Sequence, residues 1–320
     1  EQKRSGKRSV SDKVRVHLRE EQQVEFFPNF PAGRGTRADD WARQKEAEGW
    51  HGVCASDHFW VGATRYPHVF VAATQMACAT QRIKITTSFC NNLFRSPVEF
   101  AQGALALQDA SHGRFEAGLG AGWAQDEIEA VGWPYPDGPT RVSMYVEALQ
   151  VVAQLFSSGQ CTFAGEHYQI DINGEQALAT YDEPPPLIGS AGGPRALREV
   201  TPIVDRVEVK ASARATRAGH LDFNIMASVT EDEVAANVAR VKAIRPDVPI
   251  GIFILAGVGD DPLVQGLKQG LGNGYLGRFV GAAPDVAAAL KELGDMGIDR
   301  VQLTELAPGS HSRLAQELLG

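Results

Sequence analysis

The chain lacks the sequence features that mark membrane proteins, disulfide-bonded secreted proteins and nucleic-acid-binding proteins. No apolar run approaches the roughly eighteen residues of a membrane-spanning helix. The four cysteines, Cys54, Cys78, Cys90 and Cys161, are far apart and include no Cys-x-x-Cys pair, which favours reduced thiols in a cytoplasm. Lys and Arg number 31 against 39 Asp and Glu, a net charge of −8, so neither a nucleic acid nor a membrane is expected as a partner. With these partners excluded, the expected ligand is a small-molecule substrate.

Metal-binding patterns and a secretory signal are absent as well. The eight histidines include no H-x-H or H-E-x-x-H spacing, which disfavours a metal-dependent hydrolase, and no metal site is predicted. Residues 1–13 are basic and polar, with no apolar segment behind their charges. We expect them to form a disordered tail and residues 14–320 to form a single domain.

Short β-rich runs alternate with amphipathic helices along the rest of the chain, and 43% apolar residues among 320 suffice for one large core. The expected strands cover residues 14–18, 52–56, 82–89, 114–119, 187–189, 203–210, 250–258 and 300–306. The expected helices cover 36–48, 69–80, a segment from Pro97, 124–131, 141–156, 194–200, a segment from Thr230 with a capping box to Glu233, and 284–293. Eight strands separated by helices predict an α/β fold, the closed (β/α)8 TIM barrel.

Several segments depart from this alternation. The stretch through Phe26, Phe27, Pro28 and Pro31 is predicted to be irregular, and residues 161–170 to form an inserted hairpin. Residues 212–228 and 266–277 show no clear pattern. These segments are the expected insertions of the barrel.

Because the chemistry of such barrels lies at the carboxyl ends of the strands, the residues just after each strand are the candidates. Asp57 and His58 leave the second strand next to Phe59 and Trp60, which suits a pair that orients a ring or moves a proton near it. A loop cap with a surface histidine is the alternative.

The third strand ends in hydroxyls and amides, Thr86-Thr87-Ser88-Phe89-Cys90-Asn91-Asn92, which can bind a heteroaromatic ligand or simply satisfy a polar strand end. The fourth ends in Gly118-Leu119-Gly120-Ala121-Gly122-Trp123. The third glycine of a dinucleotide-binding fingerprint would fall at Trp123, so that motif fails, and these glycines favour close approach of a ligand plane to the backbone.

The fifth strand ends in Ser190-Ala191-Gly192-Gly193-Pro194-Arg195 and continues into a helix. Backbone N–H groups of such a turn can bind a phosphate, to which Ser190 and Arg195 can add donors. A purely structural turn before a helix has the same sequence.

Taken together, the motifs around Asp57-His58, Ser88-Phe89, Gly118 to Trp123 and Ser190 to Pro194 resemble the luciferase-like superfamily of flavin and deazaflavin oxidoreductases. Within it, the chain is most similar to the branch that uses coenzyme F420. The resemblance implies a luciferase-like TIM barrel that binds F420 and transfers a hydride between its C5 carbon and a small organic substrate, such as a natural product. It also implies a homodimer.

The same resemblance assigns roles to individual residues. A cis peptide at Ser88-Phe89 would back the cofactor ring, with Thr87 beside it, and Asp57 and His58 would be the catalytic pair. His58 would supply the proton, and Asp57 would orient His58 or the ring. Ser190, Ala191, Gly192 and Gly193 would hold the cofactor phosphate. The same cleft would be lined by Asn91, Asn92, Gly120 and Gly122.

One departure from the branch bears on the substrate. The sugar-phosphate dehydrogenases of this branch carry an acidic residue where this chain has Trp123, so glucose-6-phosphate is not expected as substrate. The alternatives are an FMN-dependent monooxygenase on the same scaffold, a non-catalytic flavin- or deazaflavin-binding protein, and a phosphosugar-binding barrel unrelated to flavins. Aromatic residues in the loops favour an apolar or partly aromatic substrate.

Overall fold

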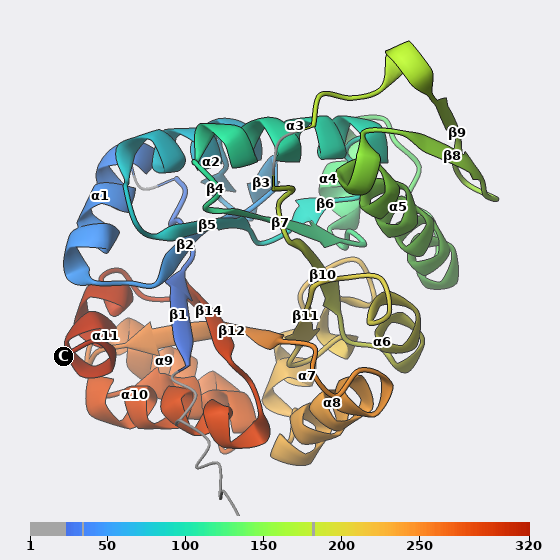
Figure 1. The fold of residues 1–320 in the computed structure, drawn as a ribbon. Helices are drawn as coiled ribbons and strands as arrows, with labels where there is room; N and C mark the ends of the chain where they lie inside the picture. Colours follow the sequence, from blue (N-terminus) through green and yellow to red (C-terminus); the bar gives the residue numbers. More distant parts are fainter. Residues whose placement is uncertain (1–23, 34, 181–182) are drawn as a thin grey trace, which may run out of the picture.

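The computed structural model describes residues 24–33, 35–180 and 183–320, which form a barrel of eight parallel strands surrounded by helices (Figure 1). In chain order, the barrel strands are β1 (Glu25–Pro28), β2 (Gly52–Ala55), β5 (Lys84–Thr87), β7 (Phe115–Gly120), β10 (Leu187–Ala191), β11 (Arg206–Lys210), β12 (Ile250–Val258) and β14 (Arg300–Glu305). Their order around the barrel is β1-β14-β12-β11-β10-β7-β5-β2. A single bridge between Asn29 and Cys54 joins the two ends, next to a hydrogen bond from Phe30 N to Cys54 O of 2.9 Å. The predicted TIM barrel is confirmed.

Helices pack around the strands and cover the outside of the barrel (Figure 1). They are α1 (Ala38–Glu48), α2 (Val69–Ala79), α3 (Pro97–Ala110), α5 (Gly138–Ser158), α6 (Pro194–Val200), α8 (Glu231–Ile244), α10 (Ala283–Lys291) and α11 (Ser310–Leu318). Within the part of the chain that the structure describes, no helix combines the length and apolar character that a membrane span needs.

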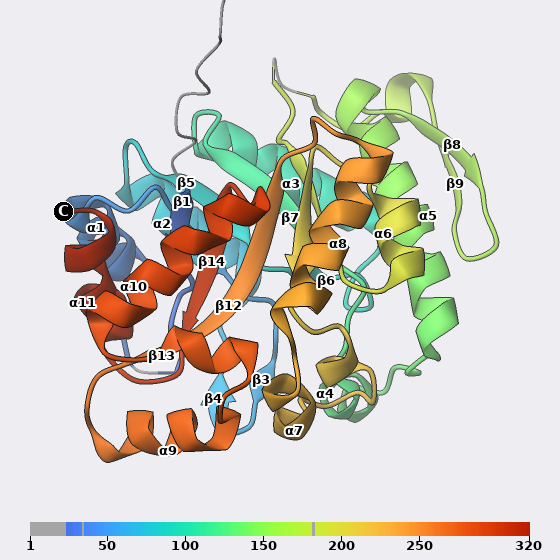
Figure 2. The ribbon, with the colours of Figure 1, turned by 90° about the horizontal axis from the view of Figure 1, so that it is seen from below.

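Smaller elements gather at the end of the barrel where the strands point (Figure 2). They are the hairpin β3 (Trp60–Val61) and β4 (Thr64–Arg65), β6 (Cys90–Asn91), α4 (Gln125–Ala130), α7 (Phe223–Ala227), α9 (Pro262–Leu271) and β13 (Val280–Gly281). Four short 3-10 helices complete the described elements: η1 (Gly174–Gln176), η2 (Arg214–Thr216), η3 (Tyr275–Phe279) and η4 (Glu292–Met296). The predicted inserted hairpin is present as β8 (Cys161–Ala164) and β9 (Gln169–Ile172), and it projects from the barrel (Figure 1).

The first strand of the barrel corrects a prediction. It lies at Glu25–Pro28, inside the stretch predicted to be irregular, whereas the predicted strand 14–18 and the predicted tail 1–13 lie outside the described residues. Phe26 and Phe27 are buried on opposite faces of the strand, and Pro28 ends it without needing to donate to the ladder. The two prolines and the short length hid a strand that is buried on both sides.

Side-chain caps explain where the helix predictions succeeded and failed. Thr230 and Glu233 form the predicted capping box of α8, with both hydrogen bonds at 3.2 Å. Asp222 and Asp261 accept backbone hydrogen bonds at the starts of α7 and α9, which lie in or next to the two segments without a pattern. An aspartate before a short helix is a start signal, and the sequence carried it within the first segment and just before the second.

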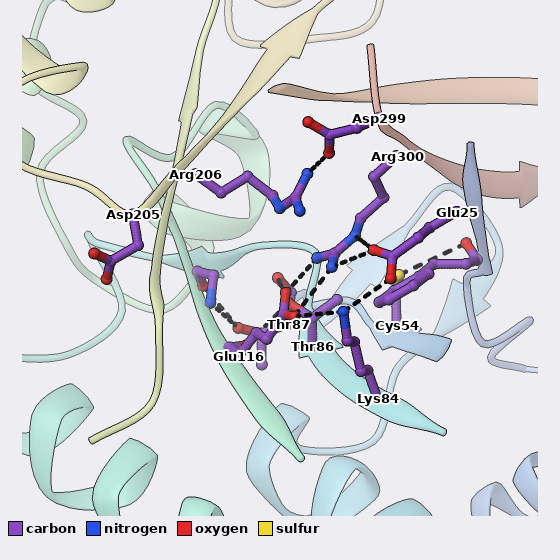
Figure 3. Close-up of polar contacts among 12 residues, drawn as sticks. Glu25, Cys54, Lys84, Thr86, Thr87, Glu116, Asp205, Arg206, Asp299 and Arg300 are labelled. Carbon is purple, nitrogen blue, oxygen red and sulfur yellow. Dashed lines mark hydrogen bonds and ion pairs between the residues drawn. The ribbon is translucent and has the colours of Figure 1, made fainter. Parts of the chain in front are cut away.

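Charged side chains fill the barrel where its strands begin (Figure 3). Arg300 is fully buried and donates through Nη2 to Glu25 at 2.7 Å and to Glu116 at 3.0 Å. Lys84 Nζ lies 2.8 Å from Glu25 as well. These contacts tie β1, β5, β7 and β14 together and leave the opposite end of the barrel for a ligand.

Candidate functional site

A cavity of about 690 Å³ opens among the carboxyl ends of the barrel strands, where the sequence predicted the chemistry. Eight of the predicted site residues lie in its wall: Asp57, His58, Ser88, Phe89, Asn91, Gly120, Gly122 and Ser190. The wall does not include six others: Thr87, Asn92, Ala191, Gly192, Gly193 and Arg195. The structure therefore brings together residues at and just after the carboxyl ends of β2, β5, β7 and β10, as a barrel requires.

The peptide bond between Ser88 and Phe89 is cis, as the family resemblance implied. Just before it, the end of β5 lies so close to its parallel neighbour β7 that a Cβ on Gly118 would lie 1.9 Å from the carbonyl oxygen of Thr87. A Cβ on Gly120 would lie 3.2 Å from the Cβ of Phe89. Glycines of the fourth strand end thus make room for the Ser88-Phe89 segment, which forms part of the cavity wall.

The carboxylate of Asp57 forms a buried ion pair. Arg95 donates to it through Nη1 at 2.5 Å and through Nη2 at 3.1 Å, and the Asn91 amide donates at 2.8 Å. Burial of the Arg95 guanidinium lowers its pKa, but the hydrogen bond to Asp57 and the negative charges nearby together outweigh burial, so the pKa of Arg95 is raised. Arg95, which the sequence did not single out as a site residue, fixes Asp57 next to the start of β6.

His58 has a different carboxylate as its partner. Its Nδ1 lies 2.6 Å from Oε1 of Glu127, a fully buried residue of α4 whose Oε2 accepts the Phe59 amide at 2.9 Å. The rings of Tyr66 and Trp123 flank the imidazole, with centroids 5.4 and 5.5 Å away. The expectation that Asp57 orients His58 is corrected: Glu127 does so, because Asp57 is already held by Arg95.

The sequence analysis predicted the helix that carries Glu127 but did not identify Glu127 as a site residue. The segment 124–131 was predicted to be a short helix, and α4 covers Gln125–Ala130. An acidic residue one turn into a helix that follows the glycines of a barrel strand was the available signal, because such a helix starts at the mouth of the barrel.

Arg195 does not point into the cavity, which corrects its predicted role as a phosphate donor. Its guanidinium donates to Glu199, to the Pro139 carbonyl at 3.0 Å and to Ser143 Oγ at 2.8 Å, so it joins α6 to the start of α5. The i,i+4 spacing to Glu199 favours this surface arrangement.

Thr87 and Asn92, two further predicted site residues, have structural partners outside the cavity. Thr87 Oγ1 donates to the Gly118 carbonyl at 2.7 Å, and Asn92 Nδ2 donates to the hydroxyl of Tyr168 at 3.2 Å. Both side chains join strand ends to neighbouring elements, and their predicted contact with a cofactor would be indirect.

The cavity offers hydrogen-bonding groups that the described residues leave unused. The hydroxyls of Ser88, Ser190 and Ser212 are buried and have no partner among the described residues, and all three residues line the wall. Gly122, with a φ of 81°, has no room for a side chain because a Cβ would lie 2.3 Å from Asn91 Oδ1. Unpaired donors beside bare backbone fit a flat, polar, heteroaromatic cofactor that approaches the chain closely.

The remainder of the wall is mainly apolar. It is formed by side chains from β12, α7, α9, η3 and the neighbouring loops: Phe30, Leu221, Phe223, Met226, Phe253, Leu255, Leu271, Leu276 and Leu306. This part of the cavity can take an apolar body without a counter-charge, in keeping with the expected kind of substrate.

Comparison with protein families and curated proteins gives consistent matches. The profile of the family described as "Luciferase-like monooxygenase" matches residues 21–261. An F420-dependent glucose-6-phosphate dehydrogenase of Kineococcus radiotolerans is 32% identical over 159 residues, 48% of this chain and 46% of that protein. The pyrimidine monooxygenase RutA of Variovorax paradoxus is 32% identical over 104 residues, 32% of this chain and 28% of that protein. The chain thus spans about half the length, or less, of these curated relatives.

Solved structures support the fold. An F420-dependent secondary alcohol dehydrogenase, in complex with an F420-acetone adduct, superimposes with a TM-score of 0.71 at 20% identity, covering 92% of this chain and 96% of the other. The coenzyme F420-dependent tetrahydromethanopterin reductase from Methanopyrus kandleri superimposes with a TM-score of 0.67 at 15% identity, covering 93% and 97%. At these identities the likeness concerns the fold alone, and it is the profile match over three quarters of the chain that decides the family. The chain belongs to the luciferase-like monooxygenase family.

Proposed function

We propose that the protein is an F420-dependent oxidoreductase that transfers a hydride between the deazaflavin and a small organic substrate. The observation that carries this proposal is the placement of His58, oriented by buried Glu127, in the same cavity wall as the cis Ser88-Phe89 bond. Such a site can hold a flat ring on one side and present a titratable imidazole beside it. The names of the F420-dependent relatives support the choice of cofactor.

The wall suggests how the chain would bind the cofactor. Ser88 and Phe89 would back the ring, Ser190 would offer its unused hydroxyl to the tail, and Asp57, fixed by Arg95, would face the ring edge. When bound, F420 supplies a C5 carbon that gives or accepts a hydride. The chain's task is then to hold substrate and ring in contact and to exclude water.

His58 is the proposed proton donor or acceptor at the substrate. A carboxylate can only accept hydrogen bonds, so Glu127 favours a proton on Nδ1 and leaves Nε2 for the cavity. Trp123 packs edge-on against the imidazole and occupies the position where sugar-phosphate dehydrogenases of the branch carry an acid. We therefore propose an apolar substrate rather than glucose-6-phosphate.

An FMN-dependent monooxygenase is the second candidate. The Ser88-Phe89 segment would back an isoalloxazine as well as a deazaflavin, and the similarity to RutA favours this alternative. Oxygen consumption in the presence of reduced FMN separates the two functions, because reduced deazaflavins react poorly with oxygen.

Parallel titrations of the purified protein with oxidised F420 and with FMN test the proposal directly. A preference for F420 of about tenfold or more, some 1.4 kcal/mol, is expected. Tighter binding of FMN would favour the monooxygenase. Binding of neither cofactor would contradict both functions.

A further inference from the structure

Three uncharged polar side chains lie together in the cavity wall, at the ends of β1, β2 and β14. They are Asn29, Ser56 and Thr304, called here the polar trio, and all three line the cavity. Asn29 Nδ2 donates to Ser56 Oγ and to Thr304 Oγ1, each at 3.0 Å. Phe30 follows Asn29, Leu255 pairs with Thr304 between β12 and β14, and both also line the cavity. The polar trio is thus a small polar patch beside apolar wall.

The hydrogen bonds of the polar trio leave one donor unused. The two hydroxyl oxygens take both hydrogens of the Asn29 amide. The Ser56 hydroxyl has two acceptors within reach, Asn29 Oδ1 at 3.2 Å and the Ser88 carbonyl at 3.3 Å. Thr304 accepts from Asn29, and no described residue accepts the hydrogen of its hydroxyl. The Thr304 hydroxyl can therefore donate to a ligand.

The Thr304 side chain points into the barrel at its open end. Side chains alternate along a strand, so Arg300 and Thr304 of β14 point to the same side. Arg300 lies inside the barrel and reaches Glu116 of β7 (Figure 3). Glu305 also lines the cavity, but its carboxylate accepts the backbone amide of His311 in α11 at 3.3 Å. The group that β14 presents from inside the barrel is therefore the neutral hydroxyl of Thr304.

The polar trio lies across the barrel from residues proposed to hold the cofactor. In the closed strand order, β14 is four strands from β7, and β1 is four strands from β10. Gly120 and Gly122 lie at the end of β7 and just after it, and Ser190 lies in β10. A ring that approaches those glycines and is backed by Ser88 leaves the polar trio facing the other occupant of the cavity. Under the proposed function, that occupant is the substrate.

We propose that Thr304, oriented by Asn29, determines specificity for a substrate that carries a neutral oxygen acceptor apart from its reacting carbon. The acceptor is a hydroxyl, ketone or ether oxygen that takes the hydrogen bond from the Thr304 hydroxyl. A phosphate or carboxylate does not fit, because the polar trio offers it no cation. His58 serves the reacting centre, so the oxygen at Thr304 is a second one. This inference rests on the proposed function and adds one polar group to the apolar substrate proposed there.

Two ketones of the same shape test this specificity, 4-hydroxy-1-tetralone and 4-methyl-1-tetralone. They differ only by a hydroxyl in place of a methyl, and kcat/KM for reduction of the ketone to the alcohol is measured with reduced F420. The wild type should prefer the hydroxy ketone about three- to tenfold, the value of one hydrogen bond. Thr304→Val replaces the hydroxyl of the wall by a methyl and should abolish this preference, whereas Thr304→Ser should keep it.

Asn29→Asp tests the orienting role of Asn29. A carboxylate can only accept hydrogen bonds, so it would take the Thr304 hydrogen and withdraw it from the substrate. This variant should therefore lose the preference with Thr304 intact. Thr162→Val is the matched control, because Thr162 is exposed on β8 and outside the cavity wall, and it should keep the ratio of the wild type.

Thermal unfolding identifies any variant that does not fold. A wild type without the preference, or a folded Thr304→Val with the ratio of the wild type, would overturn the proposal. A weaker Kd for F420 in Thr304→Val at an unchanged ratio would overturn it as well, because the polar trio would then bind the cofactor. Calorimetric affinities of the two ketones give the same ratio without turnover. If the protein binds no F420, the proposed function fails, and those affinities still decide the role of Thr304.

Discussion

His58 and Glu127 form the central pair of the site, with Nδ1 of the imidazole 2.6 Å from Oε1 of the carboxylate. They are 69 residues apart in sequence: His58 follows the barrel strand β2, and Glu127 lies on α4, the helix that follows β7. Because Glu127 also accepts the Phe59 amide, its carboxylate is fixed on both oxygens and can fix the imidazole in turn. The arrangement leaves one ring nitrogen of His58 available to a ligand in the cavity.

Glu127→Gln should lower kcat by about 10- to 100-fold while changing the Kd for F420 little. An amide can donate as well as accept, so it no longer dictates which ring nitrogen of His58 carries the proton. The ¹⁵N chemical shifts of the imidazole report that tautomer directly. A purely structural role for Glu127 would leave the tautomer unchanged and lower stability alone. Glu129→Gln on the same helix, whose carboxylate is exposed and bonds Gln125, is the matched control.

His58→Ala should reduce turnover by roughly 100-fold or more and weaken cofactor binding much less. The reason is that the imidazole is proposed to move a proton at the substrate, a contribution of about 10²- to 10⁴-fold in enzymes of known mechanism. Steady-state kinetics with reduced F420 and fluorescence titration of the cofactor measure the two effects. An unchanged rate would remove His58 from the mechanism.

Arg95→Met should lower the free energy of unfolding by about 3 kcal/mol, because it leaves the Asp57 carboxylate buried without its cation. Asp57→Asn in the same chain should restore part of the loss, since the two residues act as one unit. Arg43→Met removes the exposed pair with Asp40 and should change stability little. Urea unfolding of Arg95→Met, Asp57→Asn, their double variant and Arg43→Met measures these differences. Additive effects of Arg95→Met and Asp57→Asn in the double variant would contradict the coupling.

Local sequence signals sufficed for much of the fold. Apolar periodicity, the Thr230 capping box and the prolines at helix starts placed most helices, and α6 and β12 match the predicted boundaries. The strand-end motifs also placed Asp57, His58, Ser88 and Ser190 in one cavity wall. This works because a barrel converts the end of every strand into one shared surface, so that position along each strand predicts proximity.

Side-chain contacts between elements distant in sequence could not be predicted in the same way. Which carboxylate reaches His58, and whether Arg195 turns to the cavity or to α5, depends on side-chain reach between elements distant in sequence. Strand β1 was not predicted because its four residues include a proline, and it is recognisable as a strand only from its pairing with β14.

The buried carboxyl of Glu208, in β11, should make the stability of the protein depend on pH. Glu208 is buried beside Gly251, where a Cβ would lie 2.2 Å from its carboxylate, and neither carboxylate oxygen has a hydrogen-bond partner among the described residues. Burial raises the pKa of Glu208 to about 7, against the opposing charges of Arg300 and Arg206, with Asp299 contributing in the same direction as burial.

The native state therefore holds the Glu208 proton more tightly than the unfolded chain, whose carboxyl has a pKa of about 4.5. The stabilising effect of the protonated form is complete below pH 4.5 and is lost as the pH rises through 7. Relative to Glu208→Gln, the wild type should lose on the order of 3 kcal/mol of unfolding free energy between those values. Urea unfolding from pH 4.5 to 8 measures the difference, and Glu175→Gln, at an exposed position, should follow the wild type. Parallel curves for Glu208→Gln and the wild type would contradict the prediction. They would mean that the Glu208 carboxyl has the same pKa in the folded and the unfolded state, as it would if water reached it inside the barrel.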